Sequence, residues 1–126
     1  MAKYIDGFLL VVPKKNLDEY KKMARLGAKM WKKFGALDYK ECMGEDLNPK
    51  SQKDMKHQVF TKLTKAKPNE TVWFSYIVYK SKKHRDSVNA KVMQEMEKTM
   101  AEYKNKPMPF DMKRFTYGGF EVMVDI

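Results

Sequence analysis

Apolar residues follow a strand-like pattern near the start of the chain and a helical pattern directly after it. Residues 4–12 (YIDGFLLVV) are rich in large and β-branched apolar side chains, which predicts a strand that breaks at Pro13. From Asn16 onward, apolar or small residues recur every three or four positions, at Leu17, Tyr20, Ala24, Ala28 and Trp31. This spacing predicts an amphipathic helix that begins at an Asn16 cap and ends at Gly35.

The middle of the chain contains two more predicted strands and an irregular connection between them. Residues 36–45 predict the second strand, because apolar residues alternate with polar ones. Residues 48–69 form an irregular, lysine-rich connection with a short element around residues 57–63. Residues 71–79 (TVWFSYIVY) give the clearest strand, and their apolar side chains at odd and even positions place it in the centre of a sheet.

The last part of the chain predicts a second helix and a fourth strand. The helix is predicted from Lys82 to about Tyr103, with an apolar stripe formed by Val88, Val92, Met96, Met100 and Tyr103. Prolines break the chain after it, and residues 115–124 are predicted to form a strand. Two adjacent glycines, Gly118 and Gly119, interrupt this strand and suggest a bulge or a close approach of the backbone. The order βαββαβ predicts an α+β, ferredoxin-like subunit, with a mostly antiparallel four-stranded sheet and two helices on one face. We expect residues 1–126 to form this one domain.

The predicted strands at residues 4–12 and 71–79 are apolar on both of their faces. Helices cover only one face of the sheet in this topology, so the apolar residues of the other face need a different cover. A second copy of the chain is the simplest cover, because a two-fold interface uses one self-complementary patch. The sequence therefore predicts a homodimer in which the two sheets pack face to face.

The chain has 126 residues and a formal net charge of +10, carried mostly by lysine. Lysine is a point charge that reads nucleic-acid bases poorly, and the predicted third strand does not match the aromatic signature of RNA-recognition modules. Nucleic acid is therefore not the favoured partner. The alternative is non-specific nucleic-acid binding through the lysine-rich connection, at Lys50, Lys53, Lys56, Lys62, Lys65 and Lys67.

Signals for export, membranes and metals are sparse. No apolar run approaches the roughly 18 residues of a membrane span, and the run at residues 8–12 is too short for a signal peptide. The single cysteine, Cys42, excludes an internal disulfide and fits a reducing compartment. Together these features lead us to expect a cytoplasmic protein. Cys42 and the two distant histidines show no metal-ligand spacing, so we expect no metal and no cofactor.

Residues 81–93 (SKKHRDSVNAKVM) carry the most distinctive polar pattern, at the start of the second predicted helix. At about 100° per residue, Arg85 and Asn89 fall within the apolar stripe of this helix, whereas His84 lies at its border. An arginine that faces a sheet needs a carboxylate or another anion as its partner. Asp6, inside the first predicted strand, is the candidate internal partner.

Two interpretations of this cluster stay open. In the structural interpretation, Arg85 pairs with Asp6 or Asp86, and Asn89 ties down a loop. In the functional interpretation, a small anionic or aromatic molecule binds in a pocket between the helices and the sheet, at Arg85, Asn89, His84 and Asp6. His84 is also the candidate for acid–base catalysis, because a histidine side chain titrates near neutral pH. The residues alone leave open whether the protein is an enzyme.

Four sequence blocks resemble, in the same order, those of an uncharacterised bacterial family named domain of unknown function 1428, the YbaA-like proteins. The blocks are YIDGFLLVVPKKNLDEYKKMA, WKKFGALDYKEC, ETVWFSYIVYKSKKHRDSVNAKVM and MPFDMKRFTYGGFEVMVD. The resemblance covers nearly the whole chain and implies a dimeric α/β-barrel of ferredoxin-like subunits. That superfamily includes cofactor-free monooxygenases, haem-degrading enzymes, lactone isomerases and stress-response proteins, so it implies no single chemistry.

Three functions remain as alternatives. The first is a homodimer that binds a small molecule, extended to a cofactor-independent monooxygenase or isomerase. The second is the non-specific nucleic-acid-binding protein, and the third is a structural or stress-related interaction dimer with a filled interior. A preformed cavity between the helices and the sheet would favour the first alternative.

Overall fold

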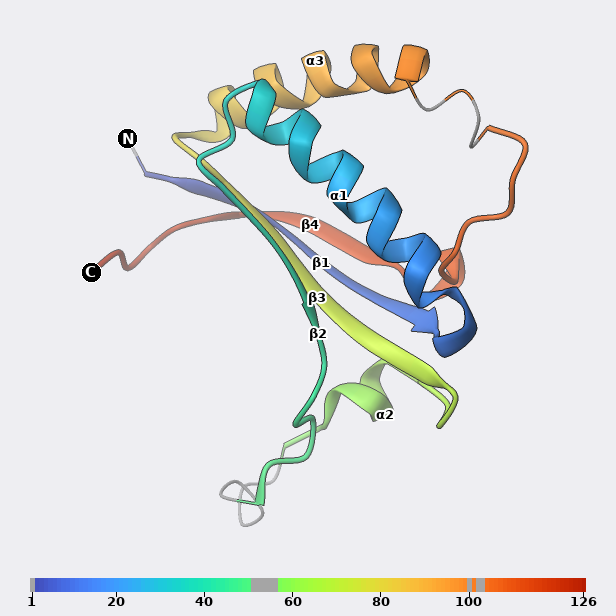
Figure 1. The fold of residues 1–126 in the computed structure, drawn as a ribbon. Coiled ribbons are helices and arrows are strands. Elements are labelled where there is room, and N and C mark those ends of the chain that lie inside the picture. Colours follow the sequence, from blue (N-terminus) through green and yellow to red (C-terminus); the bar gives the residue numbers. More distant parts are fainter. Residues whose placement is uncertain (1, 51–56, 100, 102–103) are drawn as a thin grey trace.

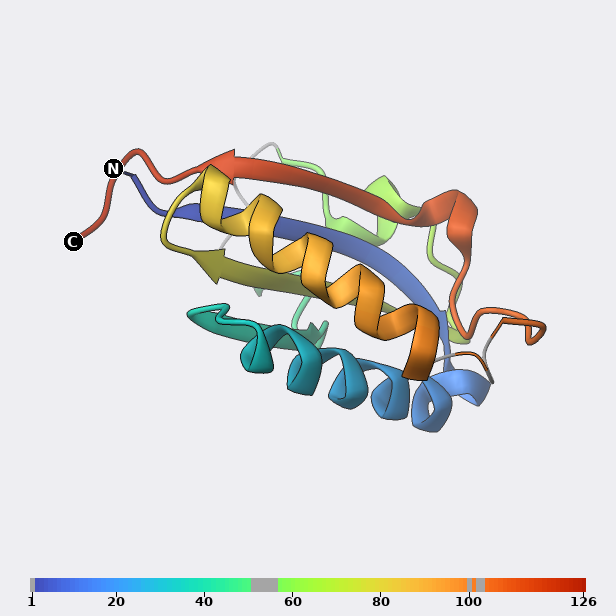
Figure 2. The same ribbon diagram turned by 90° about the horizontal axis from the view of Figure 1, so that it is seen from above.

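The computed structural model describes residues 2–50, 57–99, 101 and 104–126. Its strands are β1 (Tyr4–Pro13), β2 (Asp38–Met43), β3 (Glu70–Tyr79) and β4 (Thr116–Glu121), and its helices are α1 (Leu17–Lys33), α2 (Phe60–Thr64) and α3 (Lys82–Thr99). All strand pairs are antiparallel, in the order β2-β3-β1-β4. Figures 1 and 2 show α1 and α3 on the same face of this sheet. The predicted α+β, ferredoxin-like βαββαβ architecture is confirmed.

The two strands predicted to be apolar on both faces are the central pair of the sheet. β1 and β3 pair over their whole length, from Tyr4 opposite Tyr79 to Pro13 opposite Glu70. Because side chains alternate along a strand, this register places Asp6, Phe8 and Leu10 on the face that the helices cover. The core on that face consists of two buried clusters, with Met30, Ile77, Tyr79, Val88 and Val92 in one and Leu10, Val12, Tyr20 and Trp73 in the other.

The ends of helix α1 follow from its sequence, with one correction. Acidic residues occupy its first turn and lysines its last turn, where each charge sign stabilises the helix dipole. Gly35 then takes a φ of 104°, which favours glycine and ends the helical run. The predicted cap by the Asn16 side chain is wrong, because Asn16 Nδ2 instead donates a hydrogen bond to the Pro109 carbonyl, 3.3 Å away. This contact ties the start of α1 to the segment that precedes β4.

Other predicted boundaries differ by a few residues. The second and fourth strands are shorter than predicted, and the short element expected around residues 57–63 is helix α2. The two glycines of β4 form no bulge, because the register with β1 is continuous. The alternative, a close approach, is confirmed at Gly119, where a Cβ would overlap the ring of Tyr4. Met100 and Tyr103, assigned to the stripe of the second helix, lie outside the described residues.

The face of the sheet opposite α1 and α3 is only partly covered. Helix α2 lies on this face at one end of the sheet, where Val11 and Val72 are buried (Figure 1). At the other end, Phe74 and Phe120 are 50% and 61% exposed. We call the uncovered part, formed by Ile5, Leu9, Phe74, Val78 and Phe120, the open face.

Candidate functional site

A cavity of about 210 Å³ lies between α1, α3 and the sheet. The segment between α3 and β4 contributes to its wall through Met108 and Phe110. Most of the other lining residues are aromatic or aliphatic and face the helices, and they are Phe8, Leu10, Tyr20, Met23, Ala24, Gly27, Trp31, Tyr39, Ile77, Met96 and Phe115. Tyr76 also borders the cavity, although its ring lies beside Phe74 on the opposite face of the sheet. Glu41 and Ser75 add the remaining polar groups of the wall. We call this space the aromatic cavity.

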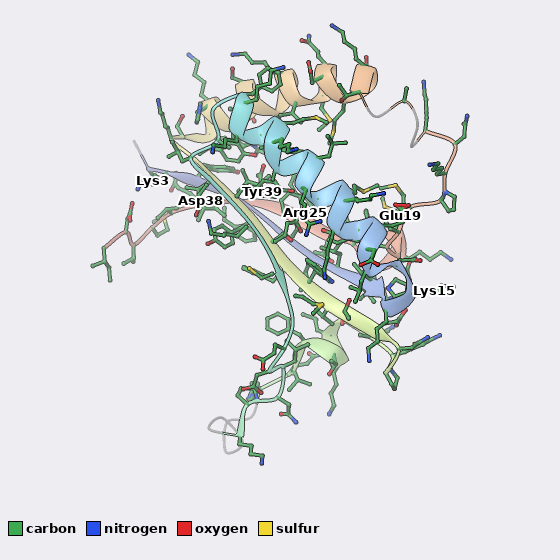
Figure 3. The ribbon with its side chains drawn as sticks, viewed as in Figure 1. Lys3, Lys15, Glu19, Arg25, Asp38 and Tyr39 are labelled. Carbon is green, nitrogen blue, oxygen red and sulfur yellow. The ribbon has the colours of Figure 1, made fainter. Side chains whose placement is uncertain are left out.

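Glu41 is placed in the cavity wall by the register of the sheet. Glu41 on β2 pairs with Ser75 on β3, and Ser75 pairs with Phe8 on β1, so the three side chains form one row beneath α1. Tyr39, two residues before Glu41, therefore lies on the same face of β2. Figure 3 labels Tyr39 on β2 and Arg25 on the neighbouring helix α1.

The Glu41 carboxylate accepts three hydrogen bonds, all from hydroxyl groups. Oε1 accepts from Tyr20 Oη at 2.8 Å and from Ser75 Oγ at 2.5 Å. Oε2 accepts from Tyr39 Oη at 2.6 Å. Burial raises the pKa of both tyrosines, and the neighbouring Glu41 carboxylate raises each pKa further. Both tyrosine hydroxyls therefore stay protonated and act as donors to Glu41, and we call these four residues the Glu41 cluster.

Positive charge near the Glu41 cluster lies outside the aromatic cavity. A shallower groove between α1 and the sheet is lined by Lys21 and Arg25 and reaches Tyr39 and Glu41 from the solvent side. Both basic side chains are exposed. Among the described residues, no lysine, arginine or histidine lines the aromatic cavity itself.

A second polar cluster surrounds Arg85 at the start of α3. Arg85 Nη1 lies 3.2 Å from Asp6 Oδ1, and Arg85 Nε lies 3.0 Å from Asp86 Oδ1. Its guanidinium group also donates to Tyr117 Oη at 3.0 Å and stacks over the ring of Tyr4, 4.9 Å from the ring centre. The ion pair expected in the structural interpretation is thus observed, and Arg85 pairs with both Asp6 and Asp86.

Asn89 connects this Arg85 cluster to the wall of the aromatic cavity. Asn89 Nδ2 donates to Asp6 Oδ2 at 3.4 Å, and Asn89 Oδ1 accepts from Trp31 Nε1 and Tyr79 Oη, each at 3.0 Å. Asp6 is 1% exposed, and its burial raises its pKa more strongly than Arg85 lowers it. Arg85 and Asn89 therefore both contact Asp6, and none of the three lines the aromatic cavity. Their binding role stays a prediction.

His84 is held in the turn between β3 and α3. Its Nδ1 accepts a hydrogen bond from the Lys80 backbone N–H at 3.0 Å, and its own backbone N–H donates to Ser81 Oγ at 3.1 Å. Burial lowers the pKa of His84, and Lys80 and Lys91 lower it further. The imidazole is therefore the neutral form near neutral pH, with Nδ1 already occupied. Its suggested acid–base role stays a prediction.

Comparison with known proteins identifies the family. The family model described as "Protein of unknown function (DUF1428)" matches residues 3–112. The chain belongs to this family. It is 43% identical, over 98% of both chains, to the uncharacterized protein YbaA of Escherichia coli strain K12 and equally to that of Shigella flexneri.

Two solved structures share the fold of this family member. One is a dimeric ferredoxin-like protein from an uncultured marine organism, with a TM-score of 0.57 and 11% identity over 100% of this chain and 98% of that one. The other is an antibiotic biosynthesis monooxygenase-like protein from Nitrosomonas europaea, with a TM-score of 0.51 and 12% identity over 97% and 91% of the two chains. At these identities, the likeness shows the fold alone.

Sequence patterns identified the Arg85 cluster but missed the Glu41 cluster. The available signal was a carboxylate at an inward position of the second strand and a serine, Ser75, inside an otherwise apolar third strand.

The structure adds little about the lysine-rich connection and about the metal and membrane signals. Lys50, Lys62, Lys65 and Lys67 are exposed, whereas Lys53 and Lys56 lie outside the described residues. Within the described ranges, we find no group of three potential metal ligands and no helix long and apolar enough to cross a bilayer.

Proposed function

We propose that the protein is a cytoplasmic homodimer and that each subunit binds a small, mainly apolar molecule in the aromatic cavity. The observation that carries this proposal is the cavity itself, whose aromatic walls surround a single carboxylate held by three hydroxyls. An apolar cavity of about 150 Å³ is large enough for benzene, so about 210 Å³ accommodates one ring with a short substituent. Of the anionic and aromatic ligands expected from the sequence, this lining supports the aromatic one.

An enzymatic form of this proposal is a cofactor-independent isomerase or monooxygenase. Glu41 is the group in the cavity wall able to accept a proton from a bound substrate, because the hydroxyls around it are donors with raised pKa. Proton transfer within a bound molecule is what an isomerase needs. Glu41 therefore replaces His84 as our candidate catalytic base.

The open face supports the dimer. Phe74 and Phe120 are large apolar side chains that are 50% and 61% exposed. The Phe120 ring lies against Gly7 of β1. A second copy would cover these rings, as expected for an apolar patch on a twisted sheet. The similar marine ferredoxin-like protein is described as dimeric, which adds support from a shared fold.

Sedimentation equilibrium tests the dimer. Wild type should sediment as a dimer at micromolar concentration, and Phe120→Glu and Phe74→Glu should sediment as monomers, because a charge in an apolar interface is costly. Met93→Glu is the matched control, since Met93 is 49% exposed on α3, away from the open face. A monomeric wild type, or dimers in all three variants, would contradict the proposed assembly.

Ligand titration followed by NMR tests the cavity. A neutral single-ring molecule such as benzyl alcohol should shift resonances of residues that line the aromatic cavity. Ala24→Leu should weaken this binding, because Ala24 lines the cavity and a larger side chain fills it. Ala90→Leu, on the exposed side of α3, should bind as wild type does. Equal binding by both variants would show that the molecule binds elsewhere.

A further inference from the structure

The charge in the aromatic cavity has the opposite sign from the charge of the protein. The chain carries 26 lysine and arginine residues and a formal net charge of +10. None of the basic residues in the described ranges lines the cavity, whereas one carboxylate, Glu41, does. A ligand that enters this space therefore meets a negative group and no positive side chain.

The hydrogen bonds of Glu41 leave room for one more donor. A carboxylate offers about four acceptor positions, two on each oxygen. Among the described residues, Oε1 accepts from Tyr20 and Ser75, whereas Oε2 accepts from Tyr39. The three hydroxyls already direct their protons to Glu41, so they are not available as donors to an anionic ligand. The open acceptor position of Oε2 suits an N–H or O–H group of a ligand.

The walls beside Glu41 favour a cation over a neutral donor. Tyr20, Trp31 and Tyr39 line the cavity together with Glu41, and the rings of Trp31 and Tyr39 lie 6.0 Å apart. Aromatic ring faces attract cations, and this attraction grows when water is excluded. Among the described residues, no positively charged side chain lines the cavity, and Lys21 and Arg25 line only the groove that reaches Glu41 from the solvent side.

We propose that the ligand of the aromatic cavity is a small organic amine, with its protonated nitrogen at Glu41 and its apolar body against the aromatic walls. This inference rests on the proposed function, because it names the chemical class of the ligand for the same cavity. The Glu41 carboxylate supplies the charge and the open acceptor, and Tyr20, Tyr39 and Ser75 hold it in place. The size of the cavity limits the apolar body to about one ring.

Three probes of nearly equal size test this assignment: benzylamine, benzyl alcohol and benzoate, which are cationic, neutral and anionic at pH 7. Isothermal titration of the wild-type protein should give the tightest binding for benzylamine and the weakest for benzoate. Since a charge-assisted hydrogen bond is stronger than a neutral one, benzylamine should bind about tenfold or more tighter than benzyl alcohol. Binding of benzyl alcohol equal to or tighter than that of benzylamine would overturn the assignment.

Glu41→Gln tests the residue, because it removes the charge and keeps the shape of the side chain. The variant should lose the preference for benzylamine, so that the ratio of its affinities for benzylamine and benzyl alcohol falls to about one. Glu97→Gln is the matched control, since Glu97 is an exposed acid on α3 that does not line the cavity. A full benzylamine preference in Glu41→Gln, or an equal loss of it in Glu97→Gln, would overturn the assignment of the amine to Glu41.

The outcomes separate this inference from the function on which it rests. If benzyl alcohol binds in the cavity and benzylamine has no advantage, the amine assignment fails and the cavity proposal stands. If none of the three probes binds wild type, both fail. If Glu41→Gln does not fold, the ranking of the three probes by wild type and its sensitivity to Ala24→Leu still decide the question.

Discussion

Two carboxylates face the helices from the same sheet, and they differ in what balances their charge. Asp6 on β1 is 1% exposed and lies 3.2 Å from the guanidinium group of Arg85. Glu41 on β2 is half-buried and accepts hydrogen bonds from three neutral hydroxyls. Both groups thus have partners, but within the described residues Asp6 is the one of the two that is paired with a cation. Arg85 thus balances the buried charge of Asp6 inside the protein, whereas no cation in the wall described for the aromatic cavity balances Glu41.

The difference assigns different roles to the two clusters. A buried ion pair that loses one partner leaves a costly unpaired charge, so the Arg85 cluster fixes the start of α3 against the sheet. Hydroxyls orient a carboxylate but leave its charge in place, so the Glu41 cluster is preorganised for an external cation. Asn89 joins the clusters through Trp31, which donates to Asn89 and also lines the aromatic cavity.

The largest expected effect on stability is that of Arg85→Ala. This change leaves Asp6 buried without its cation and should lower the free energy of unfolding at pH 7 by about 3 kcal/mol or more. Urea denaturation followed by circular dichroism measures it. Lys33→Ala is the control, because the Lys33–Glu95 pair is on the surface and should contribute less than about 1 kcal/mol. Equal losses in the two variants would place the Arg85 pair among ordinary surface pairs.

The loss caused by Arg85→Ala should shrink as the pH falls. Arg85 lowers the pKa of Asp6 and burial raises it, so removing Arg85 raises the folded-state pKa further above the ordinary value of 3.8. A carboxyl group whose pKa is higher in the folded than in the unfolded protein stabilises the fold at pH values below its unfolded-state pKa. This stabilisation is lost as the pH rises through the folded-state pKa. The variant should therefore approach wild type between pH 7 and about pH 4 in a series of urea titrations. A loss that is constant over this range would mean that Asp6 does not carry the effect.

The Arg85 cluster could be predicted from the sequence and the Glu41 cluster could not, for a physical reason. The helical period places Arg85 and Asn89 on one side of a helix, and a buried arginine needs an acid, which singles out Asp6. The Glu41 cluster depends on the register of β2 against β3, which brings Ser75 opposite Glu41, and on the packing of α1, which brings Tyr20 over both. Neither is a local property. The apolar periods predicted the fold itself, but the Asn16 cap failed because Asn16 bonds to the distant Pro109.

Glu41→Gln should destabilise the protein less than Arg85→Ala does. The amide keeps one oxygen as an acceptor, and the tyrosine hydroxyls can rotate to accept from its N–H₂ group. We expect a loss of about 1–2 kcal/mol in the free energy of unfolding, from weaker hydrogen bonds to Tyr20, Tyr39 and Ser75. The same urea titrations measure it, with Glu97→Gln as the control for the loss of one negative charge. A loss in the free energy of unfolding as large as that of Arg85→Ala would show that the main role of Glu41 is to stabilise the fold.

The smallest effect concerns anions at Arg85, which the sequence suggested as its ligands. A small anion has to replace the Asp86 carboxylate on Arg85 Nε, a buried nitrogen that lacks a well-aligned hydrogen bond among the described residues. Because one carboxylate is exchanged for another anion, phosphate near its dissociation constant should raise the melting temperature of wild type by only about 1–2 °C. Asp86→Asn removes the competing charge and keeps Asp6 in place, so it should increase this phosphate-dependent rise. Asp18→Asn, an exposed acid in the first turn of α1, controls for the change in net charge. If phosphate shifts wild type, Asp86→Asn and Asp18→Asn equally, Arg85 has no anion-binding role and its partners are Asp6 and Asp86 alone.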